Sequence, residues 1–165
     1  MDISSKIRRI QGLFVEKPVN FSWVNDRIAA SGLPAGIKHL TWLKKQGITA
    51  ILTLTEKSLN LEDIRRLDFE YRHIPMQDLK PPTVEKLVEA STFIRLITSR
   101  GGRVLVHCAA GLGRTGTVLA AYFMLENNLN PEDAIRYVRR IRPGSIEAGQ
   151  EKALWELDKL RRAGS

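Results

Sequence analysis

Short apolar runs alternate with longer segments of helical spacing along this chain. Runs rich in aliphatic and β-branched residues predict buried strands, and apolar residues recurring every three or four positions predict amphipathic helices. The predicted strands are Arg27–Ala30, Ala50–Leu54, Tyr71–Ile74 and Val104–His107. The predicted helices are Ile37–Gln46, Val84–Thr98, Thr115–Glu126, a helix that begins at Pro131 and stops before Pro143, and Ala148–Arg161.

Strands that alternate with helices are typical of an α/β fold. We therefore expect a central, mostly parallel sheet with helices on both faces. The chain has 165 residues, of which 43% are hydrophobic, and this is the size of one ordinary domain. We assign residues 1–165 to a single domain, with residues 1–19 as an N-terminal extension to it.

The segment that follows the last predicted strand carries the candidate chemistry. The only cysteine of the chain, Cys108, stands where the strand ends, and a glycine-containing loop leads from it into the next helix. Free N–H groups at a helix N-terminus favour an anion, and glycines allow the loop to curl around it. Arg114 adds a planar fork of donors that suits two phosphate oxygens. The loop predicted to bind a tetrahedral oxyanion comprises Ala109, Ala110, Gly111, Leu112, Gly113 and Arg114.

The same positive field acts on the thiol of Cys108. A cysteine beside a helix N-terminus and an arginine is stabilised as the thiolate, which is the nucleophilic form. A thiolate that faces a bound phosphate ester can attack phosphorus and form a phosphocysteine intermediate. We expect Thr115, which follows Arg114, to hydrogen-bond the sulfur. A lone cysteine is more often an inert core residue, but the arginine and glycines at this spacing favour catalysis.

The run from His107-Cys108 to Arg114-Thr115 resembles the signature loop of the cysteine-dependent protein tyrosine phosphatase superfamily. The form Ala-Gly-x-Gly-Arg-Thr-Gly is similar to that of the compact atypical dual-specificity phosphatases. Further segments that carry the resemblance are Asn20-Phe21-Ser22-Trp23-Val24, Leu54-Thr55-Glu56 and Arg142-Pro143-Gly144-Ser145-Ile146-Glu147. The resemblance implies a phosphatase of phosphotyrosine, with phosphoserine and phosphothreonine as further substrates.

Such a phosphatase needs a general acid to protonate the departing oxygen. Asp78 lies in a proline-rich loop about thirty residues before Cys108, and this loop resembles the acid loop of the family. Taken alone, Asp78 would be interpreted as a turn residue before the following helix. Its combination with the cysteine loop favours the catalytic role.

Two further residues are assigned supporting roles. His107 precedes the nucleophile on a strand, so its side chain should point away from Cys108 and hydrogen-bond the backbone of the loop. Gln150 stands near a position where the family carries a glutamine that orients the hydrolytic water, although this chain is one residue shorter there. His39 and His73 have no partners at ligand spacing, so we expect no metal and no other cofactor.

Four other functions share part of this pattern. Gly111 to Gly116 fits the dinucleotide-binding pattern G-x-G-x-x-G, but the next segment, Asn130-Pro131-Glu132-Asp133, begins a helix where that fold needs a strand. A sulfurtransferase would explain neither Asp78 nor Thr115, and an arsenate reductase would need further cysteines. A module that binds phosphorylated ligands without catalysis stays open as an alternative, although it would need no thiol.

The net charge of +8 raises the question of nucleic acid. The arginine pairs fall on predicted helices without interleaved aromatic residues, which favours solvated helix faces over nucleic-acid binding. We expect a phosphorylated protein or peptide as substrate, with inorganic phosphate or related oxyanions in the same site. An inositol phosphate or an RNA 5′ end remains an alternative substrate. No apolar run is long enough to span a membrane, and no signal peptide is evident, so we expect a cytoplasmic protein.

Overall fold

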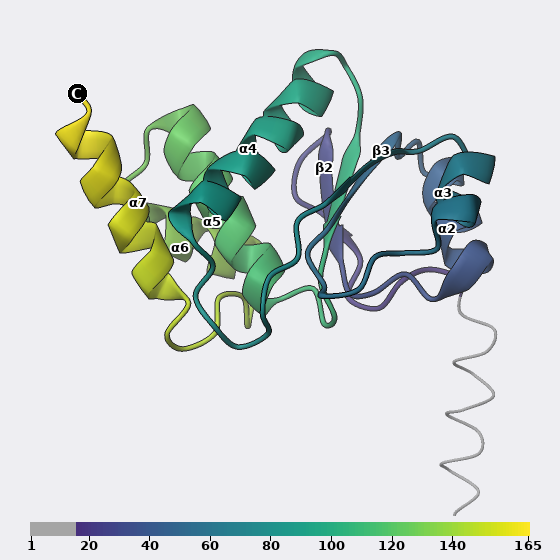
Figure 1. The fold of residues 1–165 in the computed structure, drawn as a ribbon, viewed down its shortest axis with the longest axis horizontal. Helices are drawn as coiled ribbons and strands as arrows, with labels where there is room; N and C mark the ends of the chain where they lie inside the picture. Colours follow the sequence, from purple (N-terminus) through teal and green to yellow (C-terminus); the bar gives the residue numbers. More distant parts are fainter. Residues whose placement is uncertain (1–15) are drawn as a thin grey trace, which may run out of the picture.

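A computed structural model describes residues 16–165, which are built around a five-stranded sheet (Figure 1). The strand order is β1-β2-β5-β3-β4, and every pair is parallel except β1 with β2. The strands are β1 (Ser22–Trp23), β2 (Ile28–Ser31), β3 (Ala50–Thr53), β4 (Glu70–His73) and β5 (Val104–His107). The mostly parallel α/β sheet expected from the sequence is confirmed.

The central strands are apolar because both of their faces are covered. Every residue of β2, β3 and β5 is buried, whereas the edge strand β4 alternates between exposed and half-buried residues. Parallel strands covered on both sides read as continuous hydrophobic runs. This is why Ala50–Thr53 and Val104–His107 could be recognised from the sequence.

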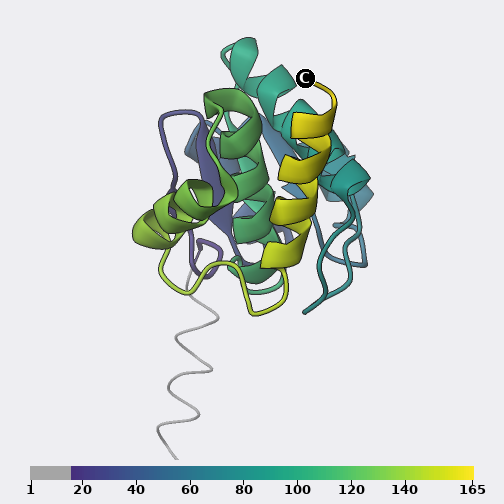
Figure 2. The same ribbon diagram turned by 90° about the vertical axis from the view of Figure 1, so that its left-hand side faces the viewer.

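The helices form a layer on each face of the sheet. One layer holds α2 (Gly36–Lys45) and α3 (Leu61–Arg66); the other holds α4 (Val84–Ser99), α5 (Gly113–Asn127), α6 (Pro131–Ile141) and α7 (Glu151–Ala163). Figure 1 shows these two groups on opposite sides of the strands, and Figure 2 shows α5 behind α6 and α7. The burial of α5 on nearly all sides agrees with its apolar composition. None of the helices in residues 16–165 is both long and apolar enough to cross a bilayer.

Several observed boundaries differ from the predicted ones. The final helix begins at Glu151 rather than Ala148, because Gly149 has a φ of +88°, outside the right-handed helical region. The first predicted strand lies one residue later, at Ile28–Ser31. The two-residue strand β1 and the short helix α3 were not among the predicted elements, since segments of this length carry little periodicity.

The parallel topology brings the carboxyl ends of the strands to one edge of the sheet. Ser31 of β2 and Thr53 of β3 both pair with His107, the last residue of β5. The loops that follow these strands are therefore neighbours, although they come from distant parts of the sequence. In parallel α/β sheets, ligands bind at this edge.

Candidate active site

The predicted oxyanion-binding loop connects the end of β5 to the buried N-terminus of α5. Gly111 lies at its turn with a φ of +78°, a conformation that favours glycine. A Cβ atom at this position would lie 2.3 Å from the backbone carbon of Ser31, so the loop packs directly on the end of β2. Position 111 therefore requires glycine both for its backbone angle and for space.

All five carbonyl groups from Cys108 to Leu112 are held by donors outside the loop. Cys108 O and Ala109 O accept from His107 Nδ1 at 3.2 Å and from the Leu33 amide at 2.9 Å. Ala110 O and Gly111 O accept from side chains, and Leu112 O accepts from the Ile146 amide at 3.2 Å. Because each peptide unit is planar and trans, carbonyls held outward leave the N–H groups on the opposite side, toward the centre of the loop. The result is a ring of donors that suits an anion.

Cys108 is nearly fully buried at the start of this loop, with 2% of its surface exposed. Its Sγ accepts a hydrogen bond from the Gly111 amide at 3.3 Å. The predicted bond from Thr115 is not present: Thr115 Oγ1 is buried and has no partner in the described part of the chain. The backbone of the loop takes this role, because Gly111 is turned toward the sulfur while Thr115 already belongs to α5.

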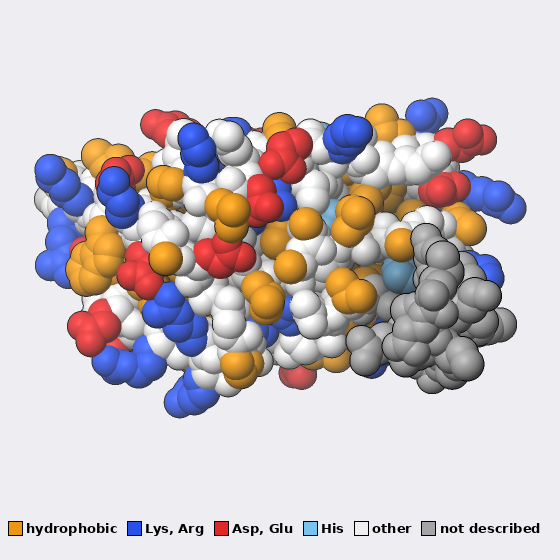
Figure 3. All heavy atoms as spheres, turned by 90° about the horizontal axis from the view of Figure 1, so that it is seen from below, with side chains coloured by type: hydrophobic (Ala, Val, Ile, Leu, Met, Phe, Trp, Pro, Cys, Tyr) orange, Lys and Arg blue, Asp and Glu red, His pale blue; other side chains and the backbone are white. Residues whose placement is uncertain are grey.

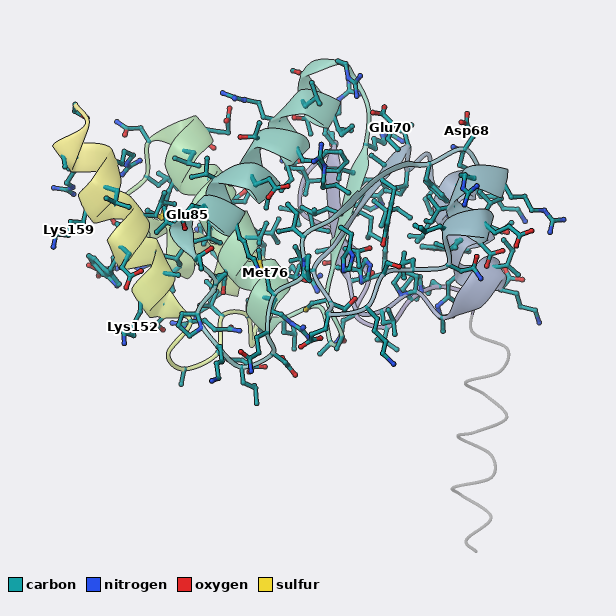
Figure 4. All side chains as sticks on the ribbon, viewed as in Figure 1. Asp68, Glu70, Met76, Glu85, Lys152 and Lys159 are labelled. Atoms are coloured by element: carbon teal, nitrogen blue, oxygen red, sulfur yellow. The ribbon has the colours of Figure 1, made fainter. Side chains whose placement is uncertain are left out.

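Arg114 occupies the first turn of α5 and is 2% exposed. Its Nη1 donates to the carbonyl of Met76 and to Glu56 Oε2, both at 3.0 Å, and its Nη2 lies 3.4 Å from Asp78 Oδ1. Its buried Nε has no partner within residues 16–165. Figure 4 shows Met76 close to the lower end of α5, where the Arg114 contacts are made. The guanidinium thus connects the oxyanion loop to the loop that contains Asp78.

Glu56 bridges these two loops, a role that the sequence interpretation did not give it. One carboxylate oxygen accepts from Arg114, and the other accepts from the Asp78 amide at 3.0 Å. Backbone N–H donors, together with Arg114, lower the pKa of Glu56 to about 2. Glu56 is therefore an anion at neutral pH. It holds Asp78, whose side chain is 58% exposed, beside the buried guanidinium.

His107 lies at the base of the loop and is completely buried. Its Nε2 is 2.7 Å from Thr53 Oγ1, and its Nδ1 faces the carbonyl of Cys108. Since a carbonyl only accepts, Nδ1 carries the proton and Nε2 accepts from the Thr53 hydroxyl. Burial lowers the pKa of His107 to about 4. A neutral imidazole that holds backbone agrees with the supporting role predicted from the sequence.

Gln150 packs against the first turn of α5. It is fully buried, its Oε1 accepts from the Glu147 amide at 3.0 Å, and its Nε2 has no partner in the part of the chain that the structure describes. An added Cβ at Gly113 would lie 2.9 Å from Gln150 Oε1, so this side chain borders the oxyanion loop. Gln150 therefore lies beside the site, with an Nε2 amide group that has no partner among the described residues.

Arg142 and Asn20 are the other residues that sequence reasoning passed over. Their side chains hold the carbonyls of Gly111 and Ala110, at 2.6 and 2.8 Å respectively. Both residues lie in segments that carried the family resemblance, but no spacing rule connects them to Cys108. Only the fold brings positions 20 and 142 to the same loop.

Exposed apolar side chains border the loop. Ala109 and Ala110 are exposed, and Leu33 and Leu79 are 45% and 66% exposed next to the oxyanion loop and the Asp78 loop. Figure 3 views this side of the molecule and shows hydrophobic side chains across its middle, with basic side chains toward the α7 end. Within residues 16–165, no group of three or more histidine, cysteine or acidic residues is arranged to hold a metal ion.

Comparison with known proteins agrees with this geometry. Residues 35–159 match the family model described as dual specificity phosphatase, catalytic domain. The chain is 29% identical over 122 residues to the tyrosine-protein phosphatase cdc-14 of Caenorhabditis elegans and 31% identical over 118 residues to the dual specificity protein phosphatase CDC14A of Homo sapiens. These matches cover 74% and 72% of this chain but only 17% and 19% of the relatives. The crystal structure of Tk-PTP in its active form superimposes with a TM-score of 0.78 and 32% identity, covering 84% of this chain and 96% of the other.

Proposed function

This chain belongs to the dual specificity phosphatase family, and on that basis we propose that it is a phosphomonoester hydrolase that works through a phosphocysteine intermediate. The observation that carries the proposal is the outward orientation of all five loop carbonyls around the start of α5. This arrangement turns backbone donors toward an anion on the side of the loop where the Gly111 amide contacts the Cys108 sulfur. A tetrahedral phosphate fits it better than a planar or an uncharged ligand.

In the first step of the proposed reaction, the Cys108 thiolate attacks phosphorus. The bond between phosphorus and the leaving oxygen breaks as the sulfur–phosphorus bond forms, and Asp78 gives its proton to that oxygen. Arg114 and the loop amides bind the equatorial oxygens and stabilise the charge of the transition state. The buried Nε of Arg114, which has no protein acceptor in residues 16–165, is available as a donor to one of these oxygens.

In the second step, water attacks the phosphocysteine and releases inorganic phosphate and the thiolate. Asp78 now acts as the base and takes a proton from this water, which returns it to its starting state. The free Nε2 of Gln150, on the buried side of the loop, is proposed to orient the water. Glu56 takes no proton in either step, since its low pKa keeps it ionised. It holds Arg114 and the acid loop together instead.

As substrate we propose a phosphorylated protein bearing phosphotyrosine, with phosphoserine and phosphothreonine as further targets. The apolar rim of Leu33, Leu79, Ala109 and Ala110 supports this, because a polypeptide side chain can pack on it. A highly charged inositol phosphate would need cations at these positions. We further propose a cytoplasmic location, because a catalytic thiol without a second cysteine depends on a reducing compartment.

The test is hydrolysis of para-nitrophenyl phosphate by the wild type and by Cys108→Ser, with a metal chelator and a reductant, between pH 5 and 8. The proposal predicts turnover by the wild type and none by the variant, while inorganic phosphate binds to both. If the wild type binds phosphate but shows no turnover on any aryl or peptide phosphate, the protein is a phospho-ligand binding module instead. Phosphotyrosine and phosphoserine peptides, an inositol phosphate and a 5′-phosphorylated RNA then rank the substrates.

A further inference from the structure

Two of the five loop carbonyls are held by side chains from opposite ends of the chain. Asn20 Nδ2 donates to Ala110 O at 2.8 Å, and Arg142 Nη2 donates to Gly111 O at 2.6 Å. Asn20 precedes β1, whereas Arg142 follows α6. These two contacts fall on the consecutive peptide units on either side of Gly111, the residue whose backbone has the greatest freedom to rotate.

The orientation of these peptide units decides whether N–H donors or carbonyl oxygens face the anion. The Ala110 carbonyl and the Gly111 N–H belong to one planar unit, so a carbonyl held outward keeps the N–H inward. That same N–H donates to Cys108 Sγ at 3.3 Å. In the same way, the Gly111 carbonyl and the Leu112 N–H belong to one planar peptide unit. If either unit rotated, a carbonyl oxygen would face the anion and one donor would be lost.

Arg142 is buried and is held in place by further hydrogen bonds. It is 4% exposed, and its Nη1 donates to the hydroxyl of Ser22 and to the carbonyl of Ala30 at 3.4 Å. Burial lowers its pKa, while attraction to the Cys108 sulfur raises it. The guanidinium is therefore a second buried cation near the nucleophile, in addition to Arg114.

Asn20 is held in place by its own segment. It has a φ of 52°, a left-handed conformation that asparagine tolerates better than most residues. The carbonyl of the preceding Val19 accepts from the Gly32 amide at 2.8 Å, which fixes the segment beside the end of β2. Asn20 lies outside residues 35–159, the part of the chain that matches the family model.

We infer that Asn20 and Arg142 are positioning residues that form a clamp on the oxyanion loop, holding the peptide units on either side of Gly111 with their N–H groups toward the phosphate and the sulfur. This inference rests on the proposed function, and through Asn20 it extends the phosphate-binding machinery beyond the region that matches the family model. The clamp contacts neither the substrate nor the reacting atoms. It sets the donor geometry on which both binding and thiolate stabilisation depend.

The test compares Asn20→Ala, Arg142→Lys and Arg142→Met with the wild type. Two matched controls remove similar contacts elsewhere: Asn60→Ala removes the N-cap of α3, and Arg161→Met removes bonds to the carbonyls of Met124 and Leu129. Three quantities are measured for each protein: thermal stability, the Kd for inorganic phosphate by calorimetry, and the rate of alkylation of Cys108 by iodoacetamide between pH 5 and 8.

We expect Asn20→Ala to weaken phosphate binding about 3- to 10-fold and Arg142→Met about 10- to 100-fold, as suits the loss of a neutral and of a charge-assisted hydrogen bond. Alkylation of both variants should shift to higher pH, because the thiolate loses a donor or a nearby cation. Arg142→Lys keeps the charge and should recover part of both properties. The two controls should lose thermal stability but keep the wild-type phosphate affinity and alkylation profile.

Wild-type phosphate affinity and alkylation profile in folded Asn20→Ala and Arg142→Met would refute the clamp, even if both were less stable. Asn20→Ala decides the outcome if Arg142→Met does not fold. The measurements are independent of turnover. A wild type that binds phosphate without hydrolysing an ester would refute the proposed function, while the variants would still test the clamp.

Discussion

Lowering the pH should lower the free energy of unfolding, because a buried histidine lies beneath the oxyanion loop. His107 is completely buried, and its pKa is about 4 in the folded protein compared with 6.5 in an unfolded chain. Burial is the largest cause, and the nearby charge of Arg114 adds to it. Because the folded-state pKa is the lower one, the unfolded chain binds more protons between these two values. The stability linked to His107 is therefore fully present above pH 6.5 and is lost as the pH falls toward 4.

The size of the effect follows from the two pKa values. A tenfold difference in proton affinity corresponds to about 1.4 kcal/mol, so the full loss is about 3 to 4 kcal/mol. Between pH 7 and pH 4.5, where most of the folded protein still has a neutral imidazole, the loss is about 2 to 3 kcal/mol. This is a large part of the ordinary stability of a domain. The pKa of Glu56 is about 2, so its own contribution is lost mainly below this range.

The assay is urea unfolding at pH 7, 5.5 and 4.5, with the free energy of unfolding obtained by linear extrapolation. His107→Asn keeps an N–H donor near Cys108 but cannot titrate, so its stability should fall about 2 to 3 kcal/mol less than that of the wild type over this range. His39→Asn, in α2, is the matched control for replacing a histidine with asparagine. If His107→Asn and the wild type lose the same free energy between pH 7 and pH 4.5, the imidazole is not held neutral by burial, and the argument is wrong.

Three other predictions test the catalytic arrangement. Asp78→Asn should lower kcat by about 10²- to 10⁴-fold for a substrate with a poor leaving group, and full activity on such a substrate would exclude Asp78 as the acid. Glu56→Gln removes the anion that bridges Arg114 and the Asp78 amide, so kcat/KM should fall about 10-fold or more, with wild-type values counting against the bridge. Gly111→Ala would place a Cβ atom 2.3 Å from Ser31 at a φ of +78°, so we expect loss of phosphate binding and destabilisation of about 2 kcal/mol or more, measured by calorimetry and urea unfolding.

Much of the fold could be predicted because the signals were strong and local. The central strands are buried on both faces and read as continuous apolar runs, and the helix after Asn130 begins with an N-cap and a proline at its first turn. The short β1 and α3 were not predicted, since elements of two and six residues show no clear period. The start of α7 depended on the positive φ of Gly149, which the sequence pattern alone does not reveal.

For the site, the sequence by itself was enough to predict the functional residues that are close together in the chain. The nucleophile, the glycine turn and the arginine of the oxyanion loop lie within seven positions, from Cys108 to Arg114, so their chemistry could be read from their spacing. Only the tertiary structure decided the long-range partners, Asn20, Glu56 and Arg142. Their roles depend on how the strands and α6 bring separate segments to one edge of the sheet, and on the direction of individual carbonyl groups there. It also decided that the Gly111 amide, and not Thr115, bonds the sulfur, because backbone orientation in a tight turn is set by what packs around it.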